Sequence, residues 1–316
     1  MNYIKNIKVS YGVLIYTNPN ILKITNQYLK LKSIQATNKF LNCQTKKCKT
    51  ERNNYIKKIL IEEFTAHKCA NCPSAAEQLK AIYDLYPQQI IGIAIHAKNS
   101  FSTPTPTQVS PNGFTYDFRT PFGSYIYENI MESCPIPQGM VNRIGYPEGD
   151  HKLLKTQWLD VVENERLKEV NVGIQINPNI NSNNGEINIL IDIINNINGS
   201  YKLAVVLVEN NIINWQINGD FEVNNYEHNH VLRTSIYNDF FSSNLNYISG
   251  DKINKSISLN IDNLQQENIT YSNSIEDGNG NAGEWNINNM SIIAYIYNSD
   301  TYEVIQVEEV KLTNTL

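Results

Sequence analysis

Two kinds of hydrophobic pattern divide the chain. Between residues 57 and 168, short and fully apolar runs alternate with stretches in which apolar side chains recur every three or four positions. The first pattern is typical of buried strands and the second of amphipathic helices. From about residue 170 onward, apolar and polar residues instead alternate over short segments, which is typical of strands with one solvated face.

The first pattern predicts an α/β domain in which strands and helices follow each other in turn. Apolar runs at 57–64 and 90–96 predict central strands of a covered sheet. The remaining elements are helices at 74–86, 121–132 and 153–168, and a short strand at 139–143. A Pro-, Thr- and Ser-rich loop at 97–120 is long enough to shape a groove.

The second pattern predicts an all-β antiparallel sandwich without helices. Turn-forming clusters rich in Asn and Gly separate the alternating segments. The predicted strands are 170–176, 187–193, 201–209, 212–217, 230–236, 253–261, 290–297 and 302–312. We therefore expect a loosely ordered leader at 1–54, an α/β domain at 55–168 and a β-sandwich domain at 169–316.

The strongest chemical signal is the pair Cys69 and Cys72, at the start of the predicted helix 74–86. Two cysteines three positions apart can share a disulfide without moving the backbone. Amide N–H groups at a helix start also stabilise a thiolate, which is the chemistry of thiol–disulfide exchange. A structural disulfide without turnover is an alternative. Half of a zinc site is a weaker one, because no second pair of ligands follows nearby.

This stretch, KKILIEEFTAHKCANCPSAAEQLKAIYDL, resembles the thioredoxin superfamily, in which a strand leads into CxxC at a helix start. The resemblance implies that Cys69 is the attacking thiol and that Cys72 is the resolving thiol. It also implies that Glu63, six residues before Cys69, accepts the proton of Cys72. Lys68 stands where thioredoxin has tryptophan, and Lys68 and His67 would both favour a thiolate electrostatically.

A second element of the same resemblance is Ile136-Pro137 before the predicted strand 139–143. Thioredoxin-like proteins place a cis proline before a strand, facing the disulfide, where its backbone pairs with an incoming peptide. The resemblance thus assigns Pro137 to substrate docking. Cys134 lies close to this loop. The sequence leaves three roles open for it: a third thiol, a partner for another cysteine, or a buried inert residue.

Three histidines allow other interpretations. His96 ends a predicted strand near the expected redox loop, and is either catalytic or hydrogen-bonded to a loop. His228 and His230 place two imidazoles on one side of a predicted strand, but no third ligand is identifiable. We therefore favour a structural edge there and expect neither a metal ion nor a cofactor.

Composition limits the partners and the compartment. The formal net charge is −5 and the pI is near 5.6, and no basic patch with interleaved aromatics occurs, which argues against nucleic-acid binding. No apolar run is long enough for a transmembrane helix. The apolar core within residues 1–16 is at the short limit for a signal peptide. Cys43 and Cys48 lie in a Lys-rich segment and could pair with each other.

Several separated motifs together resemble the twenty-eight-kilodalton outer-membrane-protein-related family of Gram-negative bacteria. They are EEFT, HKCANCP, FRTPFG, PQGMVNR and HNHVLR. The resemblance covers about residues 57–316 and implies a thioredoxin-like domain followed by a β-sandwich, in an exported and often lipid-anchored protein. It implies location in the periplasm or at the outer membrane, but no settled activity.

The leading hypothesis is a cell-envelope thiol–disulfide exchange protein that acts on protein thiols or disulfides through Cys69, Cys72, Glu63 and Pro137. The alternative is an outer-membrane-associated binding or adhesion protein. In that case the thioredoxin-like domain is a scaffold, and the β-sandwich meets an envelope protein partner.

Overall fold

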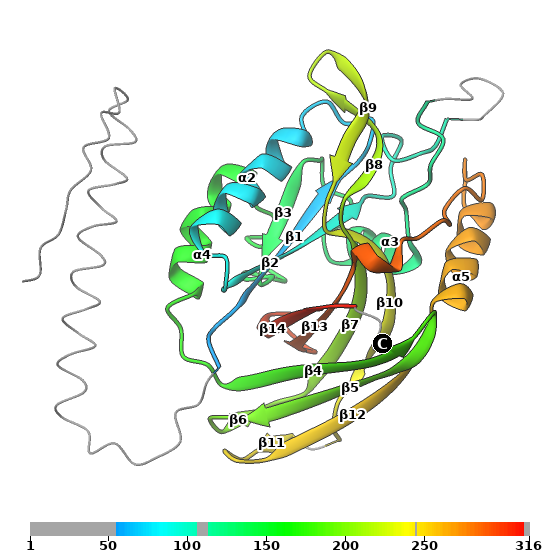
Figure 1. Ribbon diagram of the computed structural model, residues 1–316. Helices are drawn as coiled ribbons and strands as arrows, with labels where there is room; N and C mark the ends of the chain where they lie inside the picture. Colours follow the sequence, from blue (N-terminus) through cyan, green and yellow to red (C-terminus); the bar gives the residue numbers. More distant parts are fainter. Residues whose placement is uncertain (1–54, 106–112, 244, 313–316) are drawn as a thin grey trace, which may run out of the picture. The chain divides into compact units, whose positions relative to one another are not determined.

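The protein is described here from a computed structural model that covers residues 55–105, 113–243 and 245–312 (Figure 1). The predicted leader at 1–54, with Cys43 and Cys48, lies outside the described residues. The main sheet has seven strands in the order β14-β13-β7-β10-β2-β1-β3. Their bounds are β14 Val304–Lys311, β13 Met290–Asn298, β7 Tyr201–Glu209, β10 Val231–Phe240, β2 Ile90–His96, β1 Ile59–Thr65 and β3 Gln138–Val141.

Strands and helices alternate in the first part, as its hydrophobic pattern predicts. Strands β1 and β2 pair in parallel, and β3 pairs antiparallel with β1. Because both faces of β1 and β2 are covered, almost every side chain in these strands is buried. The helices of this part are α2 Pro73–Leu85, α3 Pro121–Asn129 and α4 Trp158–Glu165, the last preceded by the short 3₁₀ helix η1 Lys155–Gln157.

The sheet does not end where the hydrophobic pattern changes. Strand β10 pairs in parallel with β2 through Val231 and Ala94, and continues into the antiparallel group of β7, β13 and β14. One sheet therefore contains strands from both predicted domains. The pairing between β2 and β10 joins positions far apart in the sequence, which local periodicity does not predict. The division at residue 168 stays a prediction.

A second, three-stranded layer packs on the main sheet in the β-rich part. It has the order β12-β5-β4, with β12 Lys252–Asn260, β5 Asn184–Ile193 and β4 Val172–Asn181. Alternate residues of β7, including Leu203, Val205 and Leu207, share an aliphatic core with Ile189 and Ile191 of β5. This packing of two sheets gives the chain a β-rich fold with a mixed sheet, drawn in the lower half of Figure 1.

The remaining short elements connect these layers. Strands β6 Ile197–Asn198 and β11 Asn246–Tyr247 pair with each other. The 3₁₀ helix η2 Ile287–Asn289 leads into β13. Strands β8 Ile212–Asn218 and β9 Phe221–His228 form a separate hairpin. The sequence predicts β8 but not β9, whose side chains are mostly exposed and lack a clear apolar alternation.

The prediction that the second part contains no helix is wrong. Residues Ile261–Ser274 form α5, which begins where the Asn260 side chain accepts a hydrogen bond from the Asn263 backbone. The helix has few buried side chains, at Ile261, Asn268 and Ser272. Without a continuous apolar stripe, the pattern carries no clear helical period. In the described part of the chain, no helix is long and apolar enough to cross a membrane.

Candidate functional site

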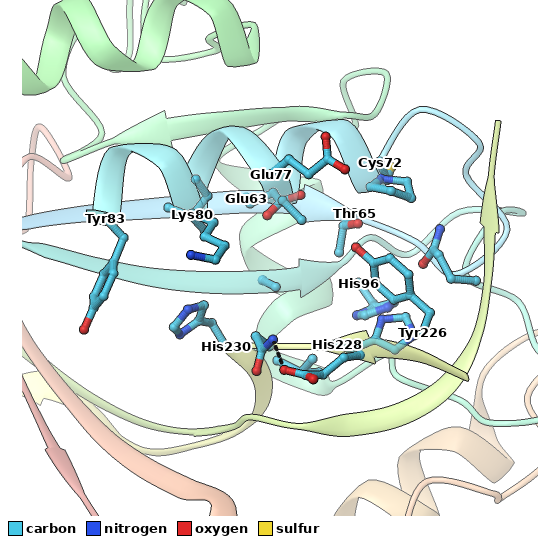
Figure 2. A pocket seen from close by; sticks show the side chains of 18 of the residues that line it. Glu63, Thr65, Cys72, Glu77, Lys80, Tyr83, His96, Tyr226, His228 and His230 are labelled. Carbon is cyan, nitrogen blue, oxygen red and sulfur yellow. Dashed lines mark hydrogen bonds between the residues drawn. The ribbon is translucent and has the colours of Figure 1, made fainter. Parts of the chain in front are cut away.

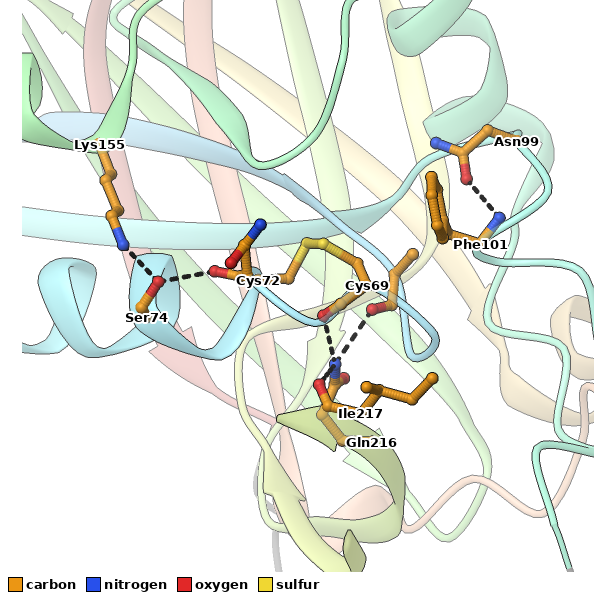
Figure 3. Close-up of a disulfide and its surroundings, with 10 residues drawn as sticks. Cys69, Cys72, Ser74, Asn99, Phe101, Lys155, Gln216 and Ile217 are labelled. Atoms are coloured by element: carbon orange, nitrogen blue, oxygen red, sulfur yellow. Dashed lines mark hydrogen bonds between the residues drawn. A yellow bond between two sulfur atoms is a disulfide. The ribbon is translucent and has the colours of Figure 1, made fainter. Parts of the chain in front are cut away.

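A disulfide joins Cys69 and Cys72 at the start of α2, with Cα atoms 5.4 Å apart (Figure 3). Cys72 is the residue before the helix, and Pro73 occupies its first turn. Pro fits there because its missing N–H would have no partner in the helix and its φ angle suits the helix. The exposed fraction is 5% for Cys69 and 1% for Cys72. The pair thus lies at a helix N-terminus, but beneath other residues.

The loop before β3 packs on one side of the disulfide. Ile136 packs against Ala66, Cys69 and Cys72, and the peptide bond between Ile136 and Pro137 is cis. Residues Gln138–Val141 then pair with β1, the strand that leads into the disulfide loop. The structure therefore places the proline loop against the cysteines, although 65 positions separate Pro137 from Cys72 in the sequence.

The hairpin β8–β9 contacts the disulfide loop from another side. The backbone N–H of Ile217 donates to the His67 carbonyl at 2.8 Å, and that of Gly219 donates to the Ala70 carbonyl at 3.0 Å. The Gln216 side chain donates to the carbonyls of Ala66 and Cys69 (Figure 3). This hairpin thus contacts the disulfide loop from a distant part of the chain.

Glu63 lies on β1 and is fully buried against α2. One of its carboxyl oxygens, Oε1, has no hydrogen-bond partner among the described residues. Burial raises the pKa of Glu63 to about 8, against a smaller opposing effect of Lys155. The carboxyl is therefore protonated at neutral pH and can both donate and accept a proton near neutrality.

A cavity of about 350 Å³ connects Glu63 with the disulfide (Figure 2). Cys72 and Glu63 both line it, together with side chains of α2. The hairpin contributes Gln216 and Tyr226 to its wall. Glu63 and Cys72 thus line one cavity, in which water can carry a proton between them.

Three buried histidines surround this region. His96 ends β2, and neither ring nitrogen has a hydrogen-bond partner among the described residues. Its ring stacks on Phe118, with centroids 4.4 Å apart. Burial lowers the pKa of His96 well below its ordinary value, that of His67 to about 3 and that of His228 to about 4. All three imidazoles are therefore neutral at neutral pH.

The neutral state of His67 corrects one expectation. The sequence predicts that His67 and Lys68 both stabilise a Cys69 thiolate by charge. His67 is instead 1% exposed, with its Nε2 atom 3.4 Å from the Thr103 carbonyl. Because the ring carries no charge near neutral pH, it cannot stabilise a thiolate by charge. Lys68 remains half-buried, and burial lowers its pKa.

His228 and His230 do not lie side by side on one strand, as the sequence pattern suggests. His228 ends β9, while His230 precedes β10 with a positive φ of 56°. Both line the cavity beside Glu63 (Figure 2). No group of three or more His, Cys, Asp or Glu side chains placed to hold a metal ion occurs among the residues that the structure covers.

Of the four residues that the sequence singles out, the structure thus brings together Cys69, Cys72 and Glu63, and it places Ile136, the neighbour of Pro137, against the two cysteines. It adds Gln216 and Tyr226, for which the sequence gives no signal. Both belong to a polar hairpin with no motif of its own. Cys134 is a half-buried free thiol, and its carbonyl accepts a hydrogen bond from Tyr127.

Comparison with known proteins identifies the family. Residues 125–315 match the family model described as Outer membrane protein Omp28. The chain belongs to the Omp28 family. Membership places the protein in the periplasm or at the outer membrane of a Gram-negative cell. A search of curated proteins found no match.

Solved structures give a likeness of fold. HBP35 of Porphyromonas gingivalis is 14% identical, with a TM-score of 0.56 over 84% of this chain and 80% of that one. Protein AGR_C_4864 from Agrobacterium tumefaciens is 13% identical, with a TM-score of 0.46 over 83% of this chain and 98% of that one. A domain of the outer membrane lipoprotein Omp28 from Porphyromonas gingivalis is 16% identical, with a TM-score of 0.27 over 47% and 93%. Only the first likeness is strong enough to support the fold.

Proposed function

We propose that this Omp28-family protein carries out thiol–disulfide exchange in the cell envelope through Cys69 and Cys72. One observation carries the proposal. Glu63 is a fully buried carboxyl without a hydrogen-bond partner for Oε1 among the described residues, and it shares a cavity with Cys72. An unpaired buried carboxyl costs folding free energy, so its position beside a disulfide favours a chemical role over a structural one.

The arrangement around the disulfide supports a thioredoxin-like region within residues 55–168. The elements follow the order β1, α2, β2, α3, β3 and α4, with β1 and β2 parallel and β3 antiparallel. Within this region we assign Cys69 as the attacking sulfur, Cys72 as the resolving sulfur and Pro137 to the docking of a protein substrate.

The proposed reaction balances without a cofactor. A thiolate of a substrate dithiol attacks Cys69 Sγ, the bond between the two protein sulfurs breaks, and Cys72 leaves as a thiolate. The Glu63 carboxylic acid, which burial keeps protonated, gives its proton to that thiolate. The second substrate thiol then gives its proton to water, from which Glu63 is reprotonated, and the resulting thiolate displaces Cys69 from the mixed disulfide, so that Cys69 leaves as a thiolate. The substrate is oxidised to a disulfide by two electrons, the protein pair is reduced, and the reverse sequence reduces a substrate disulfide.

A second candidate function is a binding or adhesion protein of the outer membrane, with the disulfide as a structural crosslink. Burial of both sulfurs favours it, because an attacking thiol needs access to Cys69. Exposed apolar side chains in the β-rich part, such as Phe221 and Ile248, offer contacts for a partner.

An insulin-reduction assay with dithiothreitol as electron donor tests the proposal. We expect the wild-type protein to accelerate the reaction. The acceleration by the Cys69→Ser variant should be at least about tenfold smaller. Cys134→Ser is the matched control and keeps the activity, because Cys134 takes no part in the exchange. Equal rates for wild type and Cys69→Ser would instead favour the binding protein with a structural crosslink.

A further inference from the structure

One polar side chain of the hairpin β8–β9 points inward. Gln216 on β8 has an exposed fraction of 2%, while Ile213 on the same strand has one of 59%. Alternation along a strand places these two positions on opposite faces. The register also shifts here, because two steps along β8, from Asn214 to Gln216, lie opposite three steps along β9, from Tyr226 to Val223, so the extra residue lies on β9.

The inward side chain holds the disulfide loop. The Gln216 Nε2 atom lies 3.2 Å from the Ala66 carbonyl oxygen and 3.1 Å from the Cys69 carbonyl oxygen. Two backbone bonds flank this contact, from Ile217 to His67 and from Gly219 to Ala70. The carbonyls of Ala66, His67, Cys69 and Ala70 are thus held by one hairpin.

Little else in the hairpin is buried. Only Gln216 and His228 are fully buried along β8 and β9, and the Phe221 side chain at the turn is 74% exposed. An element with few buried apolar contacts opens locally at a small fraction of the global unfolding free energy. The two bonds of the Gln216 side chain and the two backbone bonds of Ile217 and Gly219 therefore keep this hairpin on the disulfide loop.

We propose that Gln216 holds the β8–β9 hairpin on the disulfide loop, and that this hairpin is a cover that must open before a thiol attacks Cys69. This inference rests on the proposed function for its biological meaning. The cover itself is testable without any catalysis, because the rate at which a small dithiol reduces the disulfide reports access to Cys69.

The decisive variant is Gln216→Met, which keeps the length of the side chain and removes both N–H donors. The matched control is Ile213→Ser, on the same strand but exposed and without a contact to the disulfide loop. Two rates are measured for each folded protein. One is the reduction of Cys69–Cys72 by dithiothreitol, followed by alkylation and mass spectrometry. The other is hydrogen exchange at the amides of Ile217 and Gly219.

We expect Gln216→Met to speed both processes by the same factor, about tenfold for two lost hydrogen bonds. Equal factors follow because reduction and exchange would both proceed from the open hairpin. The Ile213→Ser control leaves both rates near those of the wild type. Equal acceleration of disulfide reduction and amide exchange in Gln216→Met supports the cover, whether or not the protein reduces insulin.

Two results would overturn the inference. Faster amide exchange with unchanged reduction would mean that dithiothreitol reaches Cys69 with the hairpin closed. No change in either rate would mean that Gln216 does not hold the hairpin. If Gln216→Met does not fold, the wild-type protein in low concentrations of urea serves instead. Reduction must then accelerate in parallel with exchange at Ile217 and Gly219, and a flat reduction rate contradicts the cover.

The two proposals fail in different ways. A cover without exchange gives faster chemical reduction of Gln216→Met and no insulin reduction by the wild type. Exchange without a cover gives insulin reduction by the wild type and equal chemical reduction of both proteins.

Discussion

Two adjacent residues of β1, Glu62 and Glu63, show two ways to bury a carboxyl. Glu62 points to one face of the sheet, where Arg143 donates to both of its oxygens at 2.7 and 2.6 Å. Glu63 points to the opposite face, where Oε1 has no partner among the described residues and a cavity leads to Cys72. Both side chains are nearly inaccessible to solvent.

This difference distinguishes a carboxyl that holds two segments together from one that can donate a proton. The two hydrogen bonds from Arg143 satisfy both oxygens of Glu62 and join the segment after β3 to β1. Burial instead raises the pKa of Glu63 to about 8, which makes this carboxyl a proton donor near neutral pH. Burial alone therefore does not indicate a functional acid, and the proposed role of Glu63 is supported by burial without a partner for Oε1 among the described residues, in a cavity that Cys72 also lines.

The largest effect in this comparison is expected for Glu62→Gln. The substitution leaves the buried Arg143 guanidinium without a carboxylate, so the free energy of unfolding should fall by about 3–5 kcal/mol. Urea unfolding at neutral pH measures it. The control is Asp84→Asn, which removes the exposed pair with Lys80 and should change stability by less than about 1 kcal/mol. A loss of similar size in both variants would contradict the structural role of Glu62.

A smaller, pH-dependent effect is expected for Glu63→Gln. Burial raises the pKa of Glu63 from 4.5 to about 8, so between these values the folded protein holds a proton that the unfolded chain releases. The free energy of unfolding of the wild type therefore falls as pH rises through this window. Gln does not titrate, so the stability of the variant relative to wild type should increase by about 3 kcal/mol from pH 5 to pH 8.

Urea unfolding of both proteins at the two pH values measures this change. Ile191→Val is the control, because Ile191 lies in the aliphatic core beside β7 and touches no titrating group of that cavity. Its effect, about 1 kcal/mol, should be the same at both pH values. A stability difference between Glu63→Gln and wild type that does not vary with pH would mean that Glu63 is ionised in the folded protein.

Much of the first part could be predicted from the sequence because its signals are local. The apolar runs that become β1 and β2 have the composition and length of central strands, and Pro73 marks the start of α2. Membership of the Omp28 family and an outer-membrane or periplasmic location also follow from separated motifs, and the match over residues 125–315 confirms them.

Long-range contacts could not be predicted in this way. Gln216 reaches Ala66 across 150 positions, and periodicity along β8 does not reveal which distant loop its side chain meets. Helix α5 has too few buried side chains to produce a helical pattern. The neutral state of His67 depends on its burial among Phe114 and Phe118, which are distant in sequence.

The redox equilibrium of Cys69–Cys72 tests thiol–disulfide exchange most directly. The purified protein is equilibrated in dithiol buffers of defined potential and alkylated, and its mass is then measured by mass spectrometry. The Cys134→Ser variant is treated in parallel to exclude other cysteine pairings. Exchange predicts a reversible transition with a midpoint above about −300 mV, within reach of protein dithiols. A pair that stays fully oxidised below about −300 mV would contradict exchange and leave a structural crosslink.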